Sequence, residues 1–463
     1  MDSPRGFFAT LREALRGGSH DFTTGSLDRA LVLLAIPMVA EMLMESLFAV
    51  VDVFFVGKLG SEAVAAVGLT ESLLAIVYAI AMGVAMAATA IVARRVGERR
   101  PEEAAAAAGQ SILLGAVVSL VISVLGVLFA PAMLRAMGAD EAVVRVGAPY
   151  AAVMLGGNAT IVALFVMNAI FRGAGDAAIS MRVLWLANGL NIVLGPMFIF
   201  GLGPFPKLGV LGAAVATTLG RGIGVALQVY VLVRGHARVA VRARHLRPDL
   251  PTLRAMFGIA GSGTLQSVIG TASWIVVSRI LAAFGSAALA GYTIGMRIVM
   301  FAILPSWGLS NAAATMVGQN LGAGRPDRAE KAVWRAGWWN TAVLSAIGLG
   351  FVIFARPICA PFTKDPAVLA HATDSLRIVS TGFLFYGFGM VFGQAFNGAG
   401  DTWTPTWINL ATFWAFELPL AWVLAHGALG AHGVYWSIAI AFSASAVVSG
   451  WFFKRGTWKT RHV

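Results

Sequence analysis

The sequence predicts an all-α integral membrane protein of twelve membrane-spanning helices in two six-helix lobes, related by a pseudo-twofold axis along the membrane normal. Of its 463 residues, 58% are hydrophobic and only 12% are charged, against about 25% charged in soluble domains. The apolar residues form long segments, each near or above the roughly 20 residues that a bilayer-crossing helix needs. No segment alternates apolar and polar residues as a membrane β-barrel requires.

Charged residues and Gly/Pro-rich breaks set the expected boundaries. We expect spans at residues 28–56, 62–91, 105–133, 142–171, 178–202, 209–234, 252–283, 287–318, 330–360, 368–396, 403–426 and 431–453. They divide the chain into an N-terminal tail (1–27), an N-terminal lobe (28–234), a linker (235–251), a C-terminal lobe (252–453) and a basic tail (454–463). The first tail has no apolar core of the kind that a signal peptide needs, so we interpret it as cytoplasmic.

An internal repeat relates the two lobes. The tetrapeptide Gly-Ala-Gly-Asp at 173–176 recurs at 398–401, which is 225 residues later. The same offset relates Gly60 to Gly285 and the dipeptide Arg-Pro at 100–101 to that at 325–326. Six spans is an even number, so both lobes enter the membrane in the same direction. Parallel repeats of this kind are typical of transporters whose substrate site lies between the halves.

The basic residues predict the orientation. The chain has a formal net charge of +12, and 24 of its 34 Lys and Arg residues fall on the side of the N-terminus, with six on the other side. This is the positive-inside distribution, which places both termini in the cytoplasm. We therefore expect a multi-pass protein of the bacterial cytoplasmic (inner) membrane, with the lipid bilayer rather than nucleic acid as its surroundings.

Three carboxylates share one face of the first span. At about 100° per residue, Glu41, Glu45 and Asp52 fall within a narrow stripe of the helix. Each acid near the bilayer centre costs roughly 2.5 to 3.5 kcal/mol on insertion scales, so such acids usually face a cavity and indicate an ion or substrate path. The 225-residue offset places Gln266, Gly270 and Val277 at the matching positions, so the stripe belongs to the N-terminal lobe alone.

Several motifs together resemble the multidrug and toxic compound extrusion (MATE) family. In the first half they include the run from Asp52 to Gly60, Arg-Gly-Ala-Gly-Asp at 172–176, and Asn-Ile-Val-Leu at 191–194. In the second half they are Val-Gly-Gln-Asn-Leu-Gly-Ala-Gly at 317–324 and Asn-Gly-Ala-Gly-Asp-Thr at 397–402. The resemblance implies a two-lobed antiporter that exports organic, often cationic, drugs against inward flow of H⁺ or Na⁺.

The DinF-like branch of that family supplies expectations for individual residues. Its coupling residues in the first, fifth and sixth spans match Asp52, Asn191 and Thr217. The sequence departs from the family where Gly195 replaces a second fifth-span acid and where Gln266 replaces a seventh-span Glu. These departures raise the importance of Glu41 and Glu45. Clustered carboxylates in a poorly solvated cavity can carry a proton, so we favour H⁺ over Na⁺ as the coupling ion.

Polar, aromatic and Met side chains within spans are candidate substrate contacts. An amide in hydrocarbon needs a partner, and Met and aromatic side chains suit an adaptable pocket. On these grounds we expect Gln266, Asn158, Asn168, Trp274 and Met42 to contact the cargo. Ordinary packing is the alternative for each of them. We expect no cofactor other than the coupling ion, no bound metal, and a monomer that acts on small organic molecules.

Three other function classes were weighed. A lipid-linked precursor flippase of the same superfamily is the main alternative, although such relatives tend to have extra spans and a cationic cavity. An integral membrane enzyme is disfavoured because the chain has no H-E-x-x-H, G-x-S-x-G or phosphate-loop motif. A channel is disfavoured because the internal repeat suits alternating access. The lone Cys359 excludes an intrachain disulfide.

Overall fold

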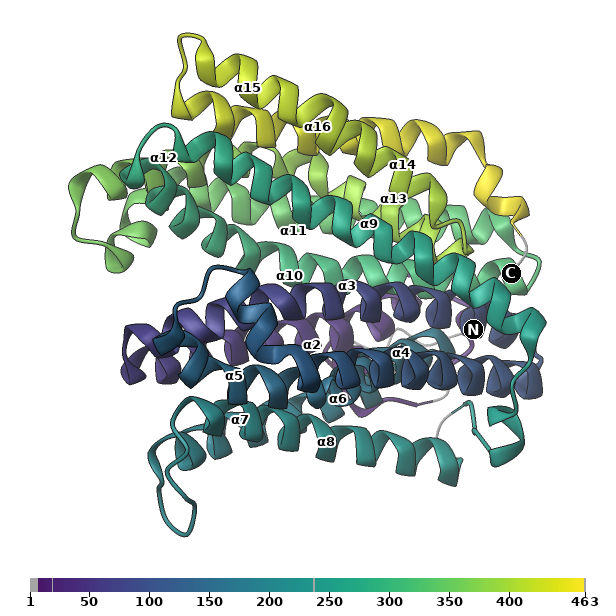
Figure 1. The fold of residues 1–463 in the computed structure, drawn as a ribbon. Helices are drawn as coiled ribbons and strands as arrows, with labels where there is room; N and C mark the ends of the chain where they lie inside the picture. The colour runs from purple at the N-terminus through teal and green to yellow at the C-terminus, as the bar shows by residue number, and fades with distance from the viewer. Residues whose placement is uncertain (1–6, 19, 236–237, 462–463) are drawn as a thin grey trace.

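A computed structural model describes residues 7–18, 20–235 and 238–461 as a helical bundle. Its α-helices are α1 (Phe7–Arg16), α2 (Leu27–Val56), α3 (Ser61–Gly97), α4 (Pro101–Ala136), α5 (Glu141–Gly156), α6 (Asn158–Ala174), α7 (Ala177–Phe200), α8 (Val210–Arg234), α9 (Leu250–Ala282), α10 (Ser286–Gly322), α11 (Pro326–Cys359), α12 (Pro366–Thr381), α13 (Phe383–Ala399), α14 (Trp403–Asn409), α15 (Leu418–His426) and α16 (Ala431–Arg455). A π-helical segment, η4 (Leu410–Glu417), joins α14 to α15. In Figure 1, α2 to α8 lie below and α9 to α16 above.

The predicted fold class is confirmed. Eleven helices of the described chain are long and apolar enough to cross a membrane, and the bent pair α12 and α13 makes twelve. Several helices run past the predicted spans: α3 has 37 residues, or about 55 Å at 1.5 Å per residue, whereas a bilayer core is about 30 Å thick. The fourth and tenth spans are each broken at a glycine, Gly157 and Gly382, and these two positions are again 225 residues apart.

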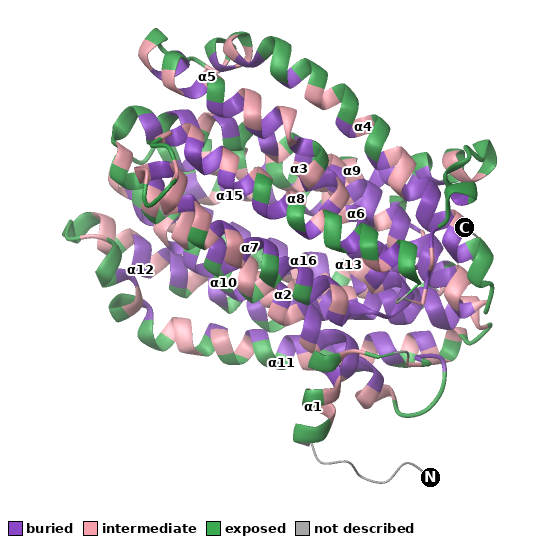
Figure 2. Cartoon of the chain, turned by 90° about the horizontal axis from the view of Figure 1, so that it is seen from below, coloured by how far each residue is buried: buried purple, intermediate pink, exposed green. Residues whose placement is uncertain are grey.

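The outer helices present apolar side chains to the surroundings. Along α4, for example, Leu120, Val124 and Leu128 are about half exposed or more. Figure 2 shows exposed residues along α4 and in the connecting loops, while buried residues run through the central helices α6, α13 and α16. A soluble protein rarely exposes a continuous apolar surface of this kind. Contact with lipid chains accounts for it.

The backbone repeats the symmetry of the sequence. Gly60 and Gly285, which precede α3 and α10, have φ values of 99° and 102°, a region that favours glycine. A Cβ atom added to Gly97 would lie 2.0 Å from the Gln319 carbonyl oxygen, and one on Gly322 would lie 2.1 Å from that of Arg94. Arg94 and Gln319 are also related by the offset of 225. The crossing of α3 and α10 therefore contains two equivalent contacts, each between a glycine of one helix and a backbone carbonyl of the other.

The end of the bundle that carries the tails is closed. At this end Gln319 donates a hydrogen bond to the carbonyl oxygen of Gly173, 2.8 Å away, across the two lobes. The buried Phe22 contributes its carbonyl oxygen to Asn320 at 3.4 Å, and its ring lies against Gly175. The N-terminal tail therefore touches both lobes where they meet.

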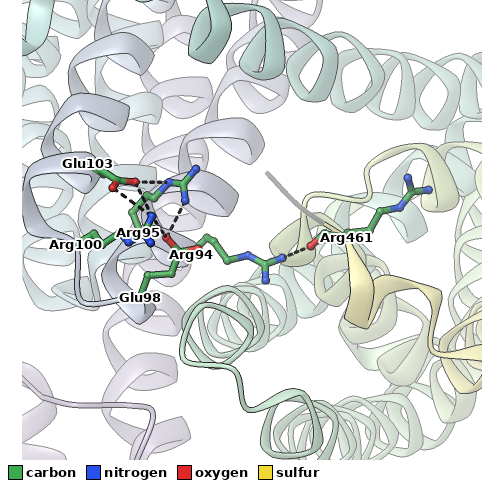
Figure 3. Close-up of polar contacts among 6 residues, drawn as sticks. All are labelled: Arg94, Arg95, Glu98, Arg100, Glu103 and Arg461. Atoms are coloured by element: carbon green, nitrogen blue, oxygen red, sulfur yellow. Dashed lines mark hydrogen bonds and ion pairs between the residues drawn. The ribbon is translucent and has the colours of Figure 1, made fainter.

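The C-terminal segment adds a second connection. The Arg94 guanidinium donates a hydrogen bond of 2.7 Å to the Arg461 carbonyl oxygen, and the Arg461 side chain lies 3.3 Å from Asp401. Figure 3 shows Arg94 reaching the C-terminal segment beside a network of ion pairs. That network includes Arg95 with Glu98 at 2.7 Å. Both tails thus hold the lobes together at one end.

Candidate functional site

A cavity of about 270 Å³ lies between the two lobes. Its walls come from α2, α3, α6, α7 and α8 on one side and from α10 and α13 on the other. The charged lining residues are Glu41, Glu45, Arg172 and Arg221. The lining includes the uncharged polar residues Thr89, Asn168, Asn311, Thr315, Gln394 and Asn397. The acids all come from the N-terminal lobe, as the sequence predicted, and the opposite wall offers amides, a hydroxyl and the indole of Trp307.

Glu41 forms a buried ion pair at the cavity wall. Its residue is 1% exposed, and its Oε1 atom accepts hydrogen bonds of 3.1 Å each from Asn168 Nδ2 and Arg172 Nη1. The other oxygen, Oε2, is buried and has no hydrogen-bond partner in the described structure. Asn168 is held in turn by Gln228, whose Nε2 donates to its Oδ1 at 2.5 Å. Oε1 of Glu41 therefore accepts two hydrogen bonds, whereas the buried Oε2 accepts none from the described residues.

Glu45 has a looser environment one helical turn away. It accepts a hydrogen bond of 2.9 Å from Asn188 Nδ2, and its nearest cation, Arg221, lies 3.9 Å away. Arg221 also donates to the Tyr78 hydroxyl at 3.2 Å, and its Nη1 atom has no partner among the described residues. The side chain of Glu45 is 33% exposed, so water reaches this acid more easily than Glu41.

The coupling residues that the resemblance suggested are only partly together. Asn191 donates a hydrogen bond of 2.7 Å to Thr217, and both side chains are buried. Asp52 is half-buried on α2, and its electrostatic neighbours are Glu71 and Arg221. It has no hydrogen bond to Asn191 or Thr217 in the described structure. A Cβ at Gly195 would lie 3.7 Å from Asn191 Oδ1, so a side chain at this position would contact the Asn191 amide directly.

The candidate substrate contacts separate into two groups. Met42 and Asn168 line the cavity. Asn158 instead joins helices inside the N-terminal lobe, where its Nδ2 bonds the Ser123 hydroxyl at 2.8 Å. Gln266 and Trp274 lie on α9 away from the cavity walls, and Trp274 packs against the apolar cluster inside the C-terminal lobe. The Asn158 side chain thus links packed helices and does not line the cavity. Its residue type alone does not distinguish these two roles.

The sequence alone does not identify the partners of the acids. Arg172 lies just beyond the fourth predicted span, 142–171, yet its side chain reaches Glu41. Arg221 is the second of these partners. Its position in the middle of the sixth span was a usable signal, because an arginine there needs an acidic or aromatic partner. Asn188 and Gln228 gave no such signal.

Comparisons with known proteins agree on one family. The family model described as MatE matches residues 37–197 and 259–423. A probable multidrug resistance protein NorM of Thermotoga maritima is 26% identical over 94% of each chain. An FAD transporter of Shewanella oneidensis is 27% identical over 87% of this chain and 89% of its own length.

Solved structures give the same result. The crystal structure of MATE in complex with MaL6 matches with a TM-score of 0.89 at 27% identity, covering 95% of this chain and 99% of that one. A structure described as the outward-facing conformation of a multidrug resistance MATE family transporter matches with a TM-score of 0.89 at 27% identity. It covers 95% of this chain and 98% of its own.

Proposed function

This chain belongs to the MatE family of membrane transporters, and from that premise we propose that it exports organic cations by alternating access in exchange for H⁺. It is a multi-pass membrane transporter and not an enzyme, and its relatives include multidrug resistance proteins. The coupling ion, the charge of the cargo, the cytoplasmic placement of both termini and a monomeric state belong to the proposal. Under that orientation the closed end faces the cytoplasm.

One observation carries the choice of H⁺: Glu41 has one hydrogen-bonded oxygen and one buried oxygen that has no hydrogen-bond partner among the described residues. The groups assigned to the bonded oxygen are N–H donors, and Na⁺ needs several oxygen ligands instead. A proton on Oε2 would cancel the negative charge of Glu41 and so weaken its attraction to Arg172. Protonation of Glu41 would therefore act directly on Arg172, which lies where the two lobes meet.

The backbone at Arg172 and Gly173 connects Glu41 to the closed end. The backbone carbonyl oxygen of Arg172 accepts a hydrogen bond of 3.1 Å from Thr315 of the opposite lobe. The next residue, Gly173, is bonded by Gln319. Protonation of Glu41 would therefore change the charge balance one side chain away from two contacts between the lobes. We propose that this is how proton binding alters the closed end.

The cavity walls support a cationic, partly apolar cargo. Arg172 and Arg221 balance Glu41 and Glu45, while Asp52 and Glu71 add negative charge near Arg221. The thioethers of Met42, Met82 and Met86 line the same space and adapt to different shapes. Exchange of one H⁺ for one monovalent cation moves no net charge. The pH gradient alone would then drive it, and each pH unit sustains about a tenfold gradient of cargo.

A second candidate is export of compounds with an acidic group. Arg172 and Arg221 both line the cavity, and Arg221 Nη1 is buried with no hydrogen-bond partner in the part of the chain that the structure describes. The Shewanella oneidensis relative is named an FAD transporter. Competition between ethidium and riboflavin monophosphate for uptake into proteoliposomes separates these candidates, since the cation dye should win under the main proposal.

The test of the proposal is proton release on binding of a cationic dye. Purified protein in weakly buffered detergent solution is mixed with ethidium, and the pH change is recorded in Na⁺ and again in K⁺. We expect release of protons in both salts and reduced release from Glu41→Gln. The variant Glu62→Gln is the matched control, because Glu62 is an exposed acid at the start of α3. Release that requires Na⁺, or dye binding with no release, would contradict H⁺ coupling.

A further inference from the structure

We propose that Glu417 is a second proton-binding site, enclosed within the C-terminal lobe and separate from the acids of α2. Glu417 ends the π-helical segment η4 and is 2% exposed. Its Oε2 atom is buried and has no hydrogen-bond partner in the described structure. This acid lies outside the walls of the cavity between the lobes, so the transport site does not account for it.

The surroundings of Glu417 contain no compensating positive charge. Within the described residues no Lys, Arg or His forms an ion pair with it, and its residue is 2% exposed. Its titratable neighbours are Tyr292 on α10 and Tyr386 on α13. Both belong to the apolar cluster of the C-terminal lobe, together with Phe413 and Leu418.

Arginines on the neighbouring helices face elsewhere. Arg279 on α9 and Arg297 on α10 are exposed, and Arg297 has Glu71 of the other lobe as an electrostatic neighbour. On α16 the apolar cluster contains the titratable residue Tyr435. Its ring stacks on Tyr292 with the centroids 6.3 Å apart, and its hydroxyl lies 3.3 Å from His371 Nδ1. Among the described residues, no helix packed against η4 places a cation in an ion pair with Glu417.

These surroundings select the ligand. A buried, unpaired carboxylate is strongly disfavoured, whereas the neutral acid leaves only a hydroxyl and a carbonyl to satisfy. A single carboxyl group in an apolar cluster offers too few oxygens for Na⁺. The ligand that this site takes is therefore a proton, and Glu417 holds it while the lobe keeps this packing.

The π-helix supplies a way to release that proton. A π segment contains one residue more than the regular turn would hold, and such segments are frequent at functional sites. Its return to α-helical form would turn the following residues by about 100° about the helix axis. The residues 225 positions earlier, 185–192, lie within the regular helix α7, so the π segment breaks the internal symmetry where the acid occurs.

The burial and contacts of Glu417 support its role as a proton-binding site. A role for Glu417 in drug export would rest in addition on the function proposed above. The direct test is infrared spectroscopy of the purified protein in nanodiscs, which detects the C=O stretch of a protonated carboxyl group. At neutral pH we expect such a band in the wild type and loss of the Glu417 contribution to it in Glu417→Gln, while protonated Glu41 keeps its own contribution. The variant Glu62→Gln, which removes an exposed acid, should keep the band.

Two more variants make the result specific. The band should survive in the triple variant Glu41→Gln, Glu45→Gln, Asp52→Asn, because it arises in the other lobe. Glu417→Asp should shift the band without removing it, which covers the case in which Glu417→Gln fails to fold. An unchanged spectrum in folded Glu417→Gln, or complete loss of the band in the triple variant, would overturn the proposal. Failure of wild-type protein to exchange dye for protons would contradict the transport proposal and leave this band in place.

Discussion

The ion pair between Glu41 and Arg172 gives the sharpest prediction for stability. The two side chains are 2% and 13% exposed and lie 3.1 Å apart, and Asn168 shares the same carboxylate oxygen. Removing one partner leaves a charge without compensation in a place that water hardly reaches. Breaking a buried pair in this way costs about 3 to 5 kcal/mol, whereas replacing both partners together is often nearly neutral.

The assay is a double-mutant cycle on the purified protein. Unfolding free energies are measured in detergent micelles for Glu41→Gln, Arg172→Met and the double variant. We expect each single variant to lose about 3 kcal/mol or more and the double variant to lose less than either. The matched pair is Arg135 and Glu141, which are bonded at 2.7 Å but exposed, and its coupling should stay below about 1 kcal/mol. Additive losses at Glu41 and Arg172 would refute the reasoning.

Three further predictions concern other contacts. Thr217→Val removes the acceptor of Asn191 and should destabilise the protein by about 1 to 3 kcal/mol, because a buried amide is left unsatisfied; an unchanged thermal unfolding midpoint would contradict this. Deletion of 457–463 removes the carbonyl that Arg94 binds and should speed maleimide labelling of Thr315→Cys in a Cys359→Ala background; equal labelling rates would show that the tail does not help to close this end. Burial lowers the pKa of His20 from 6.5, so the packed tail disfavours the protonated ring and should loosen slightly as the pH falls below 6.5. Proteolysis of the tail should show this trend, and His20→Phe should remove it.

The helices and their symmetry were predictable because both depend on local sequence. Apolar length located the spans, and the repeated Gly-Ala-Gly-Asp motif marked turns at Gly175 and Gly400 whose φ values are 92° and 83°. The stripe of acids on α2 also followed from helical geometry, and Glu41 and Glu45 line the cavity. The transport role of these acids stays a prediction.

The partners of these acids were not predictable, because they depend on how distant helices align. Glu41 and Arg172 are 131 residues apart in the chain, and a shift of one residue in the register of α6 would turn Arg172 away. The π segment that ends at Glu417 has no residue pattern that would have indicated it in the sequence. The contacts made by the tails, such as Arg94 with the Arg461 carbonyl, depend on a backbone atom, which carries no signal in the sequence.

Proton-coupled export is tested most directly by measuring dye transport driven by a pH gradient in proteoliposomes. Ethidium accumulation is followed with wild type, Glu41→Gln, Asp52→Asn and the control Glu62→Gln, each checked for folding. We expect uptake in wild type and control that needs the gradient and not Na⁺, and loss of uptake in the two α2 variants. Full gradient-driven uptake by Glu41→Gln and Asp52→Asn would contradict the claim that acids of the N-terminal lobe exchange protons for cargo.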